Sequence, residues 1–314
     1  MTKRVLLLSC ILLSSIMVGK GISVKSWGYQ LQGIDFEELK VSPFDLLVID
    51  YSMDGTNESA WNSEDILSLK EHGKTVIAYI SIGEAEDFRY YWNDSWASSP
   101  PDWMDGENPD WPGNYKVKYW TPEWQSIILD YLSVIVSQGF DGAYLDIIDA
   151  YEYYEDQGIG DAAERMVDWV SVIADFARQI RPDFLLIPQN GEGLLDFEEY
   201  WSIIDGIGIE DLFFVDAGIP RDEASLNERL SHLNKLDGAK PVLVVDYVIS
   251  ADEQMEFYSL ATSHGFIPYS TVRDLDQLTI PIWLQSNSTS EDSLNFPFLG
   301  ILLLIPLLQA YKKK

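Results

Sequence analysis

The residues best suited to chemistry are polar side chains that follow apolar runs of strand length. Six such runs end in an acid or an amide, and these residues are Asp50, Glu84, Asp146, Asn190, Glu210 and Asp246. A charge beside a buried core costs free energy unless it has a partner. A salt bridge or a helix cap explains one such residue, but six of them, five acidic, predict a functional site.

Two carboxyl groups without a cofactor are sufficient for glycoside hydrolysis. One protonates the leaving oxygen, and the other acts as nucleophile or activates water. We favour Asp146 as nucleophile and Glu210 as general acid/base, although the reverse assignment stays open. This pair predicts retention with a carboxyl separation of about 5–5.5 Å, whereas about 6.5–9.5 Å would indicate inversion. Asp149 is an imperfect alternative to Asp146, and we expect a helix-capping or supporting role for it.

These residues need a scaffold that brings the ends of several strands together. Eight apolar runs of strand length occur, at residues 27–32, 45–51, 75–82, 142–147, 184–188, 206–210, 241–247 and 265–269. Most are continuous rather than alternating, which is typical of strands buried on both faces of a parallel sheet. Helical patterns separate them, with start signals at Ser63, Thr121-Pro122, Asp161 and Ser250.

Strands alternating with helices over about 250 residues predict an α/β fold of the (β/α)8 TIM-barrel type, as a single domain over residues 22–285. Catalytic residues of such barrels lie at the carboxyl ends of the strands. Asp146 ends the fourth predicted strand and Glu210 the sixth, so the two could flank one bond. A doubly wound open sheet is the alternative, and the lack of a Gly-rich loop after the first strand disfavours it.

Other chemistries have less support in the sequence. The chain has three histidines and one cysteine, without His-x-His or His-x-x-x-His spacing and without a Gly-x-Ser-x-Gly motif. We therefore expect no cofactor and no metal. A metal-assisted hydrolase with Ca²⁺ or Mg²⁺ held by carboxylates alone stays open.

The segment from Glu84 to Trp120 is unusually long for a connection and rich in aromatic residues. It contains five of the eleven tryptophans. Because aromatic faces stack on sugar rings, we expect a minority of these rings to contact substrate, with Trp120 as a candidate. The alternative is that the segment packs them into a small core of its own. Trp27, in the first predicted strand, either floors the pocket or belongs to the core.

Six stretches carry a resemblance to a known family: WGYQLQ (27–32), VIDY (48–51), AYISIGEAE (78–86), GFDGAYLD (139–146), PQNG (188–191) and GIE (208–210). Over residues 27–280 the chain resembles glycoside-hydrolase family 114, the endo-α-1,4-polygalactosaminidases. The resemblance implies a (β/α)8 barrel that cleaves α-1,4-linked, galactosamine-rich polysaccharide with catalytic carboxylates at Asp146 and Glu210. The resemblance also implies that several residues line the substrate pocket. Together with two tyrosines of the quoted motifs, they are Asp50, Tyr51, Glu84, Tyr144, Asn190 and Asp246.

The formal net charge is −30, from 51 acidic and 21 basic side chains. Binding to nucleic acid requires clustered Lys and Arg, so this charge argues against a nucleic-acid partner. Six of the basic residues and none of the acidic ones lie in the two ends, which leaves a body of −36. An acidic body would attract a cationic amino-sugar polymer, although solubility or a salty habitat produces the same composition. A non-catalytic carbohydrate-binding barrel is the alternative to an enzyme.

Both ends of the chain are typical of targeting segments. Residues 1–21 place Lys3 and Arg4 before an apolar run of 14 residues, as in a secretory signal peptide, with an uncleaved anchor as the alternative. Residues 286–295 form a Ser/Thr-rich spacer, and residues 296–314 form a hydrophobic tail that ends in three lysines. This tail is typical of a sorting signal or a short membrane anchor. We therefore expect an extracellular or cell-surface protein, with the membrane as partner of a terminal segment.

Overall fold

The computed structural model describes residues 22–281 and residue 284. The predicted signal peptide, spacer and hydrophobic tail lie outside these residues. Of the described residues, 22–279 belong to one compact unit, and Ile280 begins a second. None of the helices in the described part of the chain is long and apolar enough to cross a membrane.

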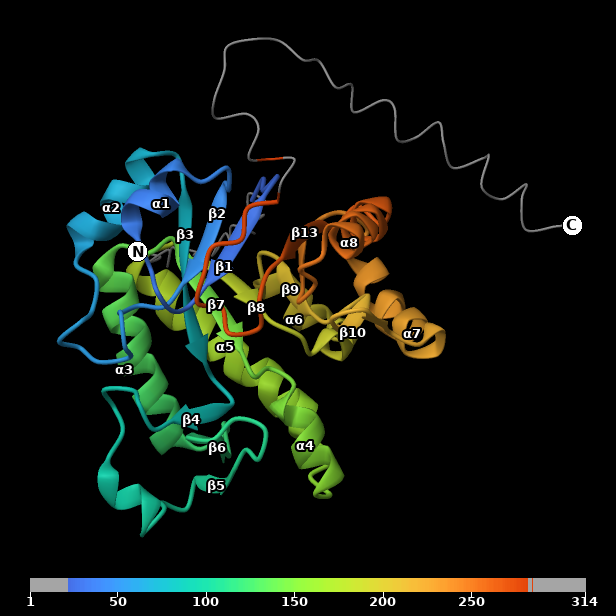
Figure 1. Ribbon diagram of the computed structural model, residues 1–314. Coiled ribbons are helices and arrows are strands. Elements are labelled where there is room, and N and C mark those ends of the chain that lie inside the picture. The colour runs from blue at the N-terminus through green and yellow to red at the C-terminus, as the bar shows by residue number, and fades with distance from the viewer. Residues whose placement is uncertain (1–21, 282–283, 285–314) are drawn as a thin grey trace, which may run out of the picture. The chain divides into compact units, whose positions relative to one another are not determined.

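The first unit is an α/β fold in which all eight predicted strands are present (Figure 1). Five form a parallel sheet in the order β1-β2-β3-β7-β8, with bounds β1 (Trp27–Gln30), β2 (Leu46–Ile49), β3 (Thr75–Ser81), β7 (Gly142–Asp146) and β8 (Leu185–Pro188). Three more are parallel in the order β13-β12-β9, with bounds β9 (Ile207–Glu210), β12 (Val242–Asp246) and β13 (Ile267–Ser270). A parallel bridge between Gln189 and Gly208 joins the end of β8 to β9. The two strands that end in the predicted acids therefore flank β8.

The helices of the first unit are α1 (Phe36–Val41), α2 (Ser63–Glu71), α3 (Pro122–Gln138), α4 (Ala150–Asp156), α5 (Ala162–Ile180), α6 (Glu198–Ile203), α7 (Glu223–Leu233) and α8 (Ala251–Ser263). Short 3₁₀ helices lie at η1 (Asp94–Ala97), η2 (Glu192–Asp196) and η3 (Asn234–Leu236). The start signals at Thr121-Pro122 and Ser250 are confirmed, since Pro122 opens α3 and the Ser250 side chain caps α8. Two details were wrong. Asn62 caps α2 in place of Ser63, and Asp161 makes no side-chain cap bond.

Aromatic side chains fill the space between the parallel strands. The ring of Tyr29 lies 6.0 Å from that of Trp27 and 5.2 Å from that of Tyr144, and all three side chains are buried. The Trp27 indole donates a hydrogen bond to the Ile267 carbonyl at 2.9 Å, which places this residue in the core. A Cβ atom at Gly208 would lie 1.9 Å from the Tyr144 hydroxyl, so only glycine leaves room for that ring.

The aromatic segment after β3 forms a small antiparallel sheet that the sequence did not predict, with bounds β4 (Glu84–Glu86), β5 (Met104–Glu107) and β6 (Asn114–Val117). Its rings contact one another: Trp96 lies 5.3 Å from Trp92 and 5.0 Å from Trp103, which lies 5.2 Å from Trp124 of α3. These three segment tryptophans therefore form a local core, as the alternative interpretation held. A second unpredicted hairpin, β10 (Phe214–Asp216) and β11 (Ile219–Pro220), follows β9.

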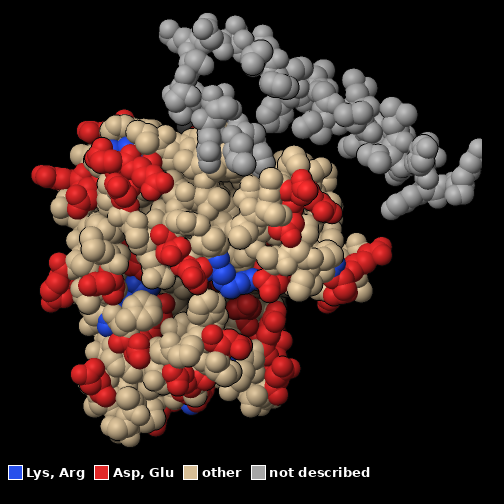
Figure 2. Space-filling view, in the orientation of Figure 1, with Lys and Arg blue, Asp and Glu red and all other residues tan. Residues whose placement is uncertain are grey.

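The surface carries the acidic excess seen in the composition. Asp and Glu side chains are spread over the face in Figure 2, where Lys and Arg are few. Basic atoms are visible beside a hollow near the centre of that view. Acidic side chains thus outnumber basic ones on this face, in line with the composition.

Candidate active site

The two favoured acids occupy equivalent positions, each as the last residue of its strand. Asp146 ends β7 and Glu210 ends β9, and both are partly exposed. Burial, and next the negative charge of Glu210, raise the pKa of Asp146 to about 8. Burial also raises the pKa of Glu210. The two groups interact, so their protons leave one after the other rather than together.

Asp146 is held by two hydrogen-bond donors. The Tyr79 hydroxyl donates to Oδ2 at 2.6 Å, and the Ile147 amide donates to Oδ1 at 2.8 Å. Ile147 has φ of 58°, an unusual value for a β-branched residue. Its carbonyl lies where a Cβ atom of residue 83 would be only 2.2 Å away, which explains why Gly83 occupies that position.

Glu210 has a matching set of partners. The Tyr247 hydroxyl donates to Oε1, and the Gln189 amide donates to Oε2 at 3.1 Å. The Glu210 backbone amide donates to the Asn190 side-chain oxygen at 3.0 Å. Asn190 and Asp211 have φ of 60° and 51°. Left-handed non-glycine residues thus adjoin both acids, and such backbone strain is concentrated at functional sites.

Sequence reasoning missed the two tyrosines that bind the acids. Each hydroxyl donates to a carboxylate from a neighbouring strand, Tyr79 from β3 and Tyr247 from the end of β12. A hydrogen bond of this kind favours the ionised carboxylate. A tyrosine in an apolar run resembles a core residue, so the available signal was only its place in the motifs AYISIGE and VVDY.

Asp50 lies in a buried ion pair that the sequence did not reveal. The Arg89 guanidinium donates to both Asp50 oxygens at 2.9 and 2.7 Å and, through Nε, to Glu86 at 2.7 Å. The side-chain exposures of Arg89, Asp50 and Glu86 are 1%, 9% and 4%. Tyr51 is buried and donates to the Gly55 carbonyl at 2.8 Å. Contact of Asp50 or Tyr51 with substrate stays a prediction, since their partners here are protein groups.

Three other predicted residues are also buried. Glu84 accepts hydrogen bonds at Oε1 from Asn108 at 2.9 Å and Lys116 at 3.4 Å, while its Oε2 has no partner among the described residues. Asp246 accepts the backbone amides of residues 212–214 at 2.8–3.0 Å and so fixes the chain after Glu210. The buried Tyr144 hydroxyl has no hydrogen-bond partner among the residues that the structure describes. Burial is the largest cause of its raised pKa, and the charges of Glu210 and Asp146 come next.

Trp120 contacts the helices that follow β7. It is half-buried, and its ring lies 4.8 Å from that of Tyr154 on α4, with the Arg165 guanidinium 5.0 Å above it. These contacts attach the end of the aromatic segment to α4 and α5. Its role in substrate binding stays a prediction.

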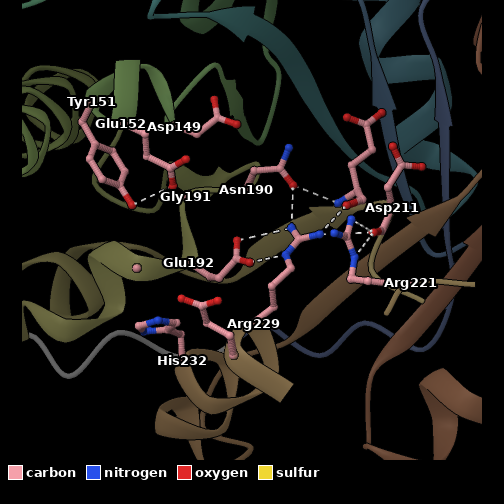
Figure 3. A pocket seen from close by; sticks show the side chains of 13 residues that line it. Asp149, Tyr151, Glu152, Asn190, Gly191, Glu192, Asp211, Arg221, Arg229 and His232 are labelled. Carbon is pink, nitrogen blue, oxygen red and sulfur yellow. Dashed lines mark hydrogen bonds and ion pairs between the residues drawn. The ribbon is translucent and has the colours of Figure 1, made fainter. Parts of the chain in front are cut away.

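A polar cavity of about 580 Å³ opens beside Glu210 (Figure 3). Its lining consists of Asp149, Tyr151, Glu152, Asn190, Gly191, Glu192, Gly193, Glu210, Asp211, Arg221, Glu228, Arg229 and His232. Arg229 binds Glu192, the Asn190 side chain at 3.4 Å and the Glu210 carbonyl at 3.1 Å. Asn190 and Glu210 are the strand-end residues predicted from sequence that this cavity brings together, and Asp146 is not in its lining.

Asp149 differs from its expected role. It precedes α4 at the N-cap position, but its side chain makes no capping hydrogen bond. Of the two predicted roles, capping was wrong, and a supporting role stays a prediction. The carboxyl group lines the cavity. Burial and, next, the charge of Glu152 raise the pKa of Asp149 to about 7.

The arrangement suits acid–base chemistry on carboxyl groups. Across the described residues, no group of three or more His, Cys, Asp or Glu side chains could hold a metal ion. Two carboxyl groups with raised pKa values, each bound by a tyrosine hydroxyl, are the kind of groups that cleavage of a glycosidic bond requires.

Comparisons with known proteins agree with this chemistry. The family model for glycoside-hydrolase family GH114 matches residues 18–286. An uncharacterized protein of Methanocaldococcus jannaschii is 42% identical over 268 residues, which cover 80% of this chain and 77% of that protein. An uncharacterized protein of Thermotoga maritima is 40% identical over 278 residues, with coverage of 84% and 86%.

Two solved structures have a similar fold. The glycoside hydrolase domain of PelA from Pseudomonas aeruginosa has a TM-score of 0.65 and 18% identity, and the match covers 82% of this chain and 99% of that chain. Ega3 from Aspergillus fumigatus, whose crystal structure is a complex with galactosamine, has a TM-score of 0.63 and 18% identity, with coverage of 81% and 94%. At this identity the likeness concerns the fold alone.

Proposed function

The chain belongs to glycoside-hydrolase family GH114, and on that premise we propose that it hydrolyses α-1,4 linkages in a galactosamine-rich polysaccharide. The observation that carries the proposal is the coupled carboxyl pair at the ends of β7 and β9. The fold it shares with Ega3, which was crystallised with galactosamine, supports the choice of an amino sugar.

We assign Asp146 as the nucleophile and Glu210 as the general acid/base of a retaining reaction. Asp146 attacks the anomeric carbon while Glu210 gives its proton to the glycosidic oxygen, and the leaving sugar departs as an alcohol. Glu210 then removes a proton from water, and the water oxygen displaces Asp146. Tyr79 and the Ile147 amide hold the nucleophile, and Tyr247 and Gln189 hold the acid/base.

A cationic substrate fits the electrostatics of this assignment. Burial and the charge of Glu210 raise the pKa of Asp146 to about 8, so the ionised form of Asp146 is disfavoured without a ligand. An ammonium group beside Asp146 favours its ionised form, which leaves the proton for Glu210. The acidic surface in Figure 2 would also attract a cationic polymer, and added salt would weaken that attraction.

We further infer that the eight parallel strands close into a (β/α)8 barrel. Within each sheet the strand order follows the sequence without reversal, unlike a doubly wound sheet. The bridge between Gln189 and Gly208 joins the sheets on one side, and the indole of Trp27 in β1 binds the Ile267 carbonyl of β13 on the other. Such closure would direct the predicted strand-end residues to one mouth.

We propose that the protein is exported and acts at the cell surface. The support comes from residues 1–21, with their signal-peptide pattern, and residues 296–314, with their hydrophobic tail and terminal lysines. Fractionation of cells, with immunodetection of the mature N-terminus and C-terminus, would locate the protein and reveal whether either segment is removed.

The hydrolytic proposal is tested by incubating the protein with purified galactosamine polymers and sizing the products. Asp146→Asn and Glu210→Gln should each lower turnover about 10³-fold or more with an unchanged circular dichroism spectrum. Glu164→Gln, an exposed carboxylate on α5, is the control and should retain full turnover. Polymer binding without products would favour a carbohydrate-binding barrel, and loss of activity in chelator would indicate a metal-assisted hydrolase.

A further inference from the structure

The cavity beside Glu210 contains a carboxyl group that neither the fold nor the catalytic pair uses. We propose that this cavity is the subsite for the sugar on the leaving-group side of the scissile bond, where Asp149, assisted by Glu152, binds the ammonium group of that sugar. The inference rests on the proposed function, because it takes Glu210 as the general acid/base.

The place of the cavity relative to the pair identifies the sugar that it receives. The general acid contacts the glycosidic oxygen, whereas the nucleophile contacts the anomeric carbon on the other side of that bond. Glu210 is part of the cavity lining and Asp146 is not. A sugar in the cavity is therefore attached through the oxygen that Glu210 protonates.

Some carboxyl groups of the cavity lining are paired with arginines, and the others remain available to bind a cation. Glu192 is paired with Arg229, and Asp211 with Arg273 at 3.0 and 3.1 Å. Among the described residues, no basic side chain pairs with the remaining carboxyl groups, which are Asp149 and the exposed Glu152 on the α4 side and the exposed Glu228 on α7. Glu152 accepts a hydrogen bond from the Tyr151 hydroxyl at 3.2 Å. The wall formed by α4 and the residue before it thus carries carboxyl groups that lack a basic partner.

Asp149 is a stronger candidate than Glu152 for binding an ammonium group, because its surroundings would favour a cation. Its side chain makes no capping bond, and in Figure 3 no interaction among the drawn residues reaches it. Besides burial, the charges of Glu152, Glu192 and Glu210 raise its pKa. An ammonium group would offset these charges, whereas an N-acetyl group would leave Asp149 without a partner. The subsite should therefore select a free amine over an acetylated one.

Transfer of a sugar to an acceptor tests this selection in the full-length protein. The bond between Asp146 and the sugar breaks, the acceptor oxygen forms the new glycosidic bond, and Glu210 takes the acceptor proton. The acceptor must occupy the leaving-group subsite. With galactosamine and N-acetylgalactosamine offered at equal concentration, the wild type should prefer galactosamine by about 10- to 100-fold. Asp149→Asn should lose most of that preference, as measured by mass spectrometry of the two products.

Glu155→Gln is the matched control, because Glu155 lies on α4, is exposed and is not part of the cavity lining. It should keep the wild-type acceptor ratio. If Asp149→Asn hydrolyses polymer but keeps the wild-type ratio, the inference is overturned and the proposed function stands.

A binding measurement separates the two ideas if the wild type releases no product. Calorimetry compares a galactosamine oligosaccharide with its N-acetylated form in Asp146→Asn and in Asp146→Asn/Asp149→Asn. Binding of the amine form that weakens about 10-fold or more in the double variant supports the subsite even without hydrolysis. Equal binding of the amine form by both variants overturns it.

Discussion

Asp146 and Glu210 end the strands β7 and β9, but the side chains that surround the two acids differ. The closed half consists of Asp146, Tyr79, Arg89, Asp50 and Glu86. The open half consists of Glu210, Tyr247, Gln189, Arg229 and Arg273. In the closed half, the buried Arg89 forms ion pairs with two buried carboxylates, Asp50 and Glu86. In the open half, Arg229 and Arg273 are partly exposed, and Arg229 lines a cavity.

This difference indicates what each half contributes. Charges that satisfy one another away from water fix a geometry but bind no ligand, because removing either partner leaves the other buried and unpaired. Charges beside a cavity remain available to exchange partners with a substrate. On the proposed assignment, the closed half positions the nucleophile, and the open half receives the leaving group.

The largest expected effect contrasts the arginines of the two halves. Arg89→Met should lower the free energy of unfolding by about 3–5 kcal/mol, since it leaves Asp50 and Glu86 buried without a cation. Arg273→Met should cost about 1 kcal/mol or less, because Arg273 is 39% exposed in its pair with Asp211. Urea unfolding curves of both variants measure the difference. Equal losses would remove the distinction between the halves.

The next effect assigns a chemical role to each half. Tyr79 and Tyr247 donate to the ionised acids, so replacing either with Phe should raise the pKa of its acid and lower kcat about 10- to 100-fold. With Asp146 as nucleophile, Tyr79→Phe should move the acidic limb of the kcat profile to higher pH. Tyr247→Phe should move the basic limb to higher pH, because a proton on Glu210 is then held more tightly.

The profiles also decide between the two assignments. If Glu210 is the nucleophile, the acidic limb reports Glu210 and the basic limb reports Asp146. Tyr79→Phe then moves the basic limb. The kcat profile is the appropriate measurement because it reports the groups in the complex with substrate. A variant with reduced kcat and unmoved limbs would indicate that its tyrosine acts only on packing.

The coupling between the halves gives a third expectation. The negative charge of Glu210 is the second cause, after burial, of the raised pKa of Asp146. Glu210→Gln removes that charge and should lower the pKa of Asp146 from about 8 toward its ordinary value. Carbon-13 NMR titration of the labelled carboxyl group measures it. A pKa unchanged by the substitution would mean that the two acids do not share a site.

Much of the scaffold could be predicted from the sequence because burial has a simple signature. The runs LLVID, VIAYISI and VLVVD are continuous apolar stretches, and each became a strand of a parallel sheet. The aromatic segment gave no such pattern. Its tryptophans alternate with Asp, Asn and Pro, so the antiparallel sheet that they support was not visible.

Some residues of the candidate site could likewise be predicted from the sequence, and others could not. Asp146 and Glu210 could be found because an acid after an apolar run is conspicuous. The bonds of Arg89 to Asp50 and of Tyr79 to Asp146 could not, since these partners lie 39 and 67 residues away in the sequence. Asp149, three residues after Asp146, was predicted to cap a helix or to support the site, and only the structure reveals that its side chain makes no capping bond. Local pattern identifies where an acid stands, but its partner depends on which strands become neighbours.

The smallest expected effect concerns backbone strain beside the nucleophile. Ile147 has φ of 58°, a conformation that costs a β-branched residue of order 1–3 kcal/mol and costs glycine almost nothing. Ile147→Gly should stabilise the folded protein by about 1 kcal/mol, because the greater freedom of glycine in the unfolded chain offsets part of the relief. It should also lower kcat, since the residue-147 amide that donates to Asp146 is less firmly oriented. Thermal unfolding and kcat are measured together. A gain in both would mean that the strained turn does not serve catalysis, and the closed half would then owe its geometry to Arg89 and Tyr79 alone.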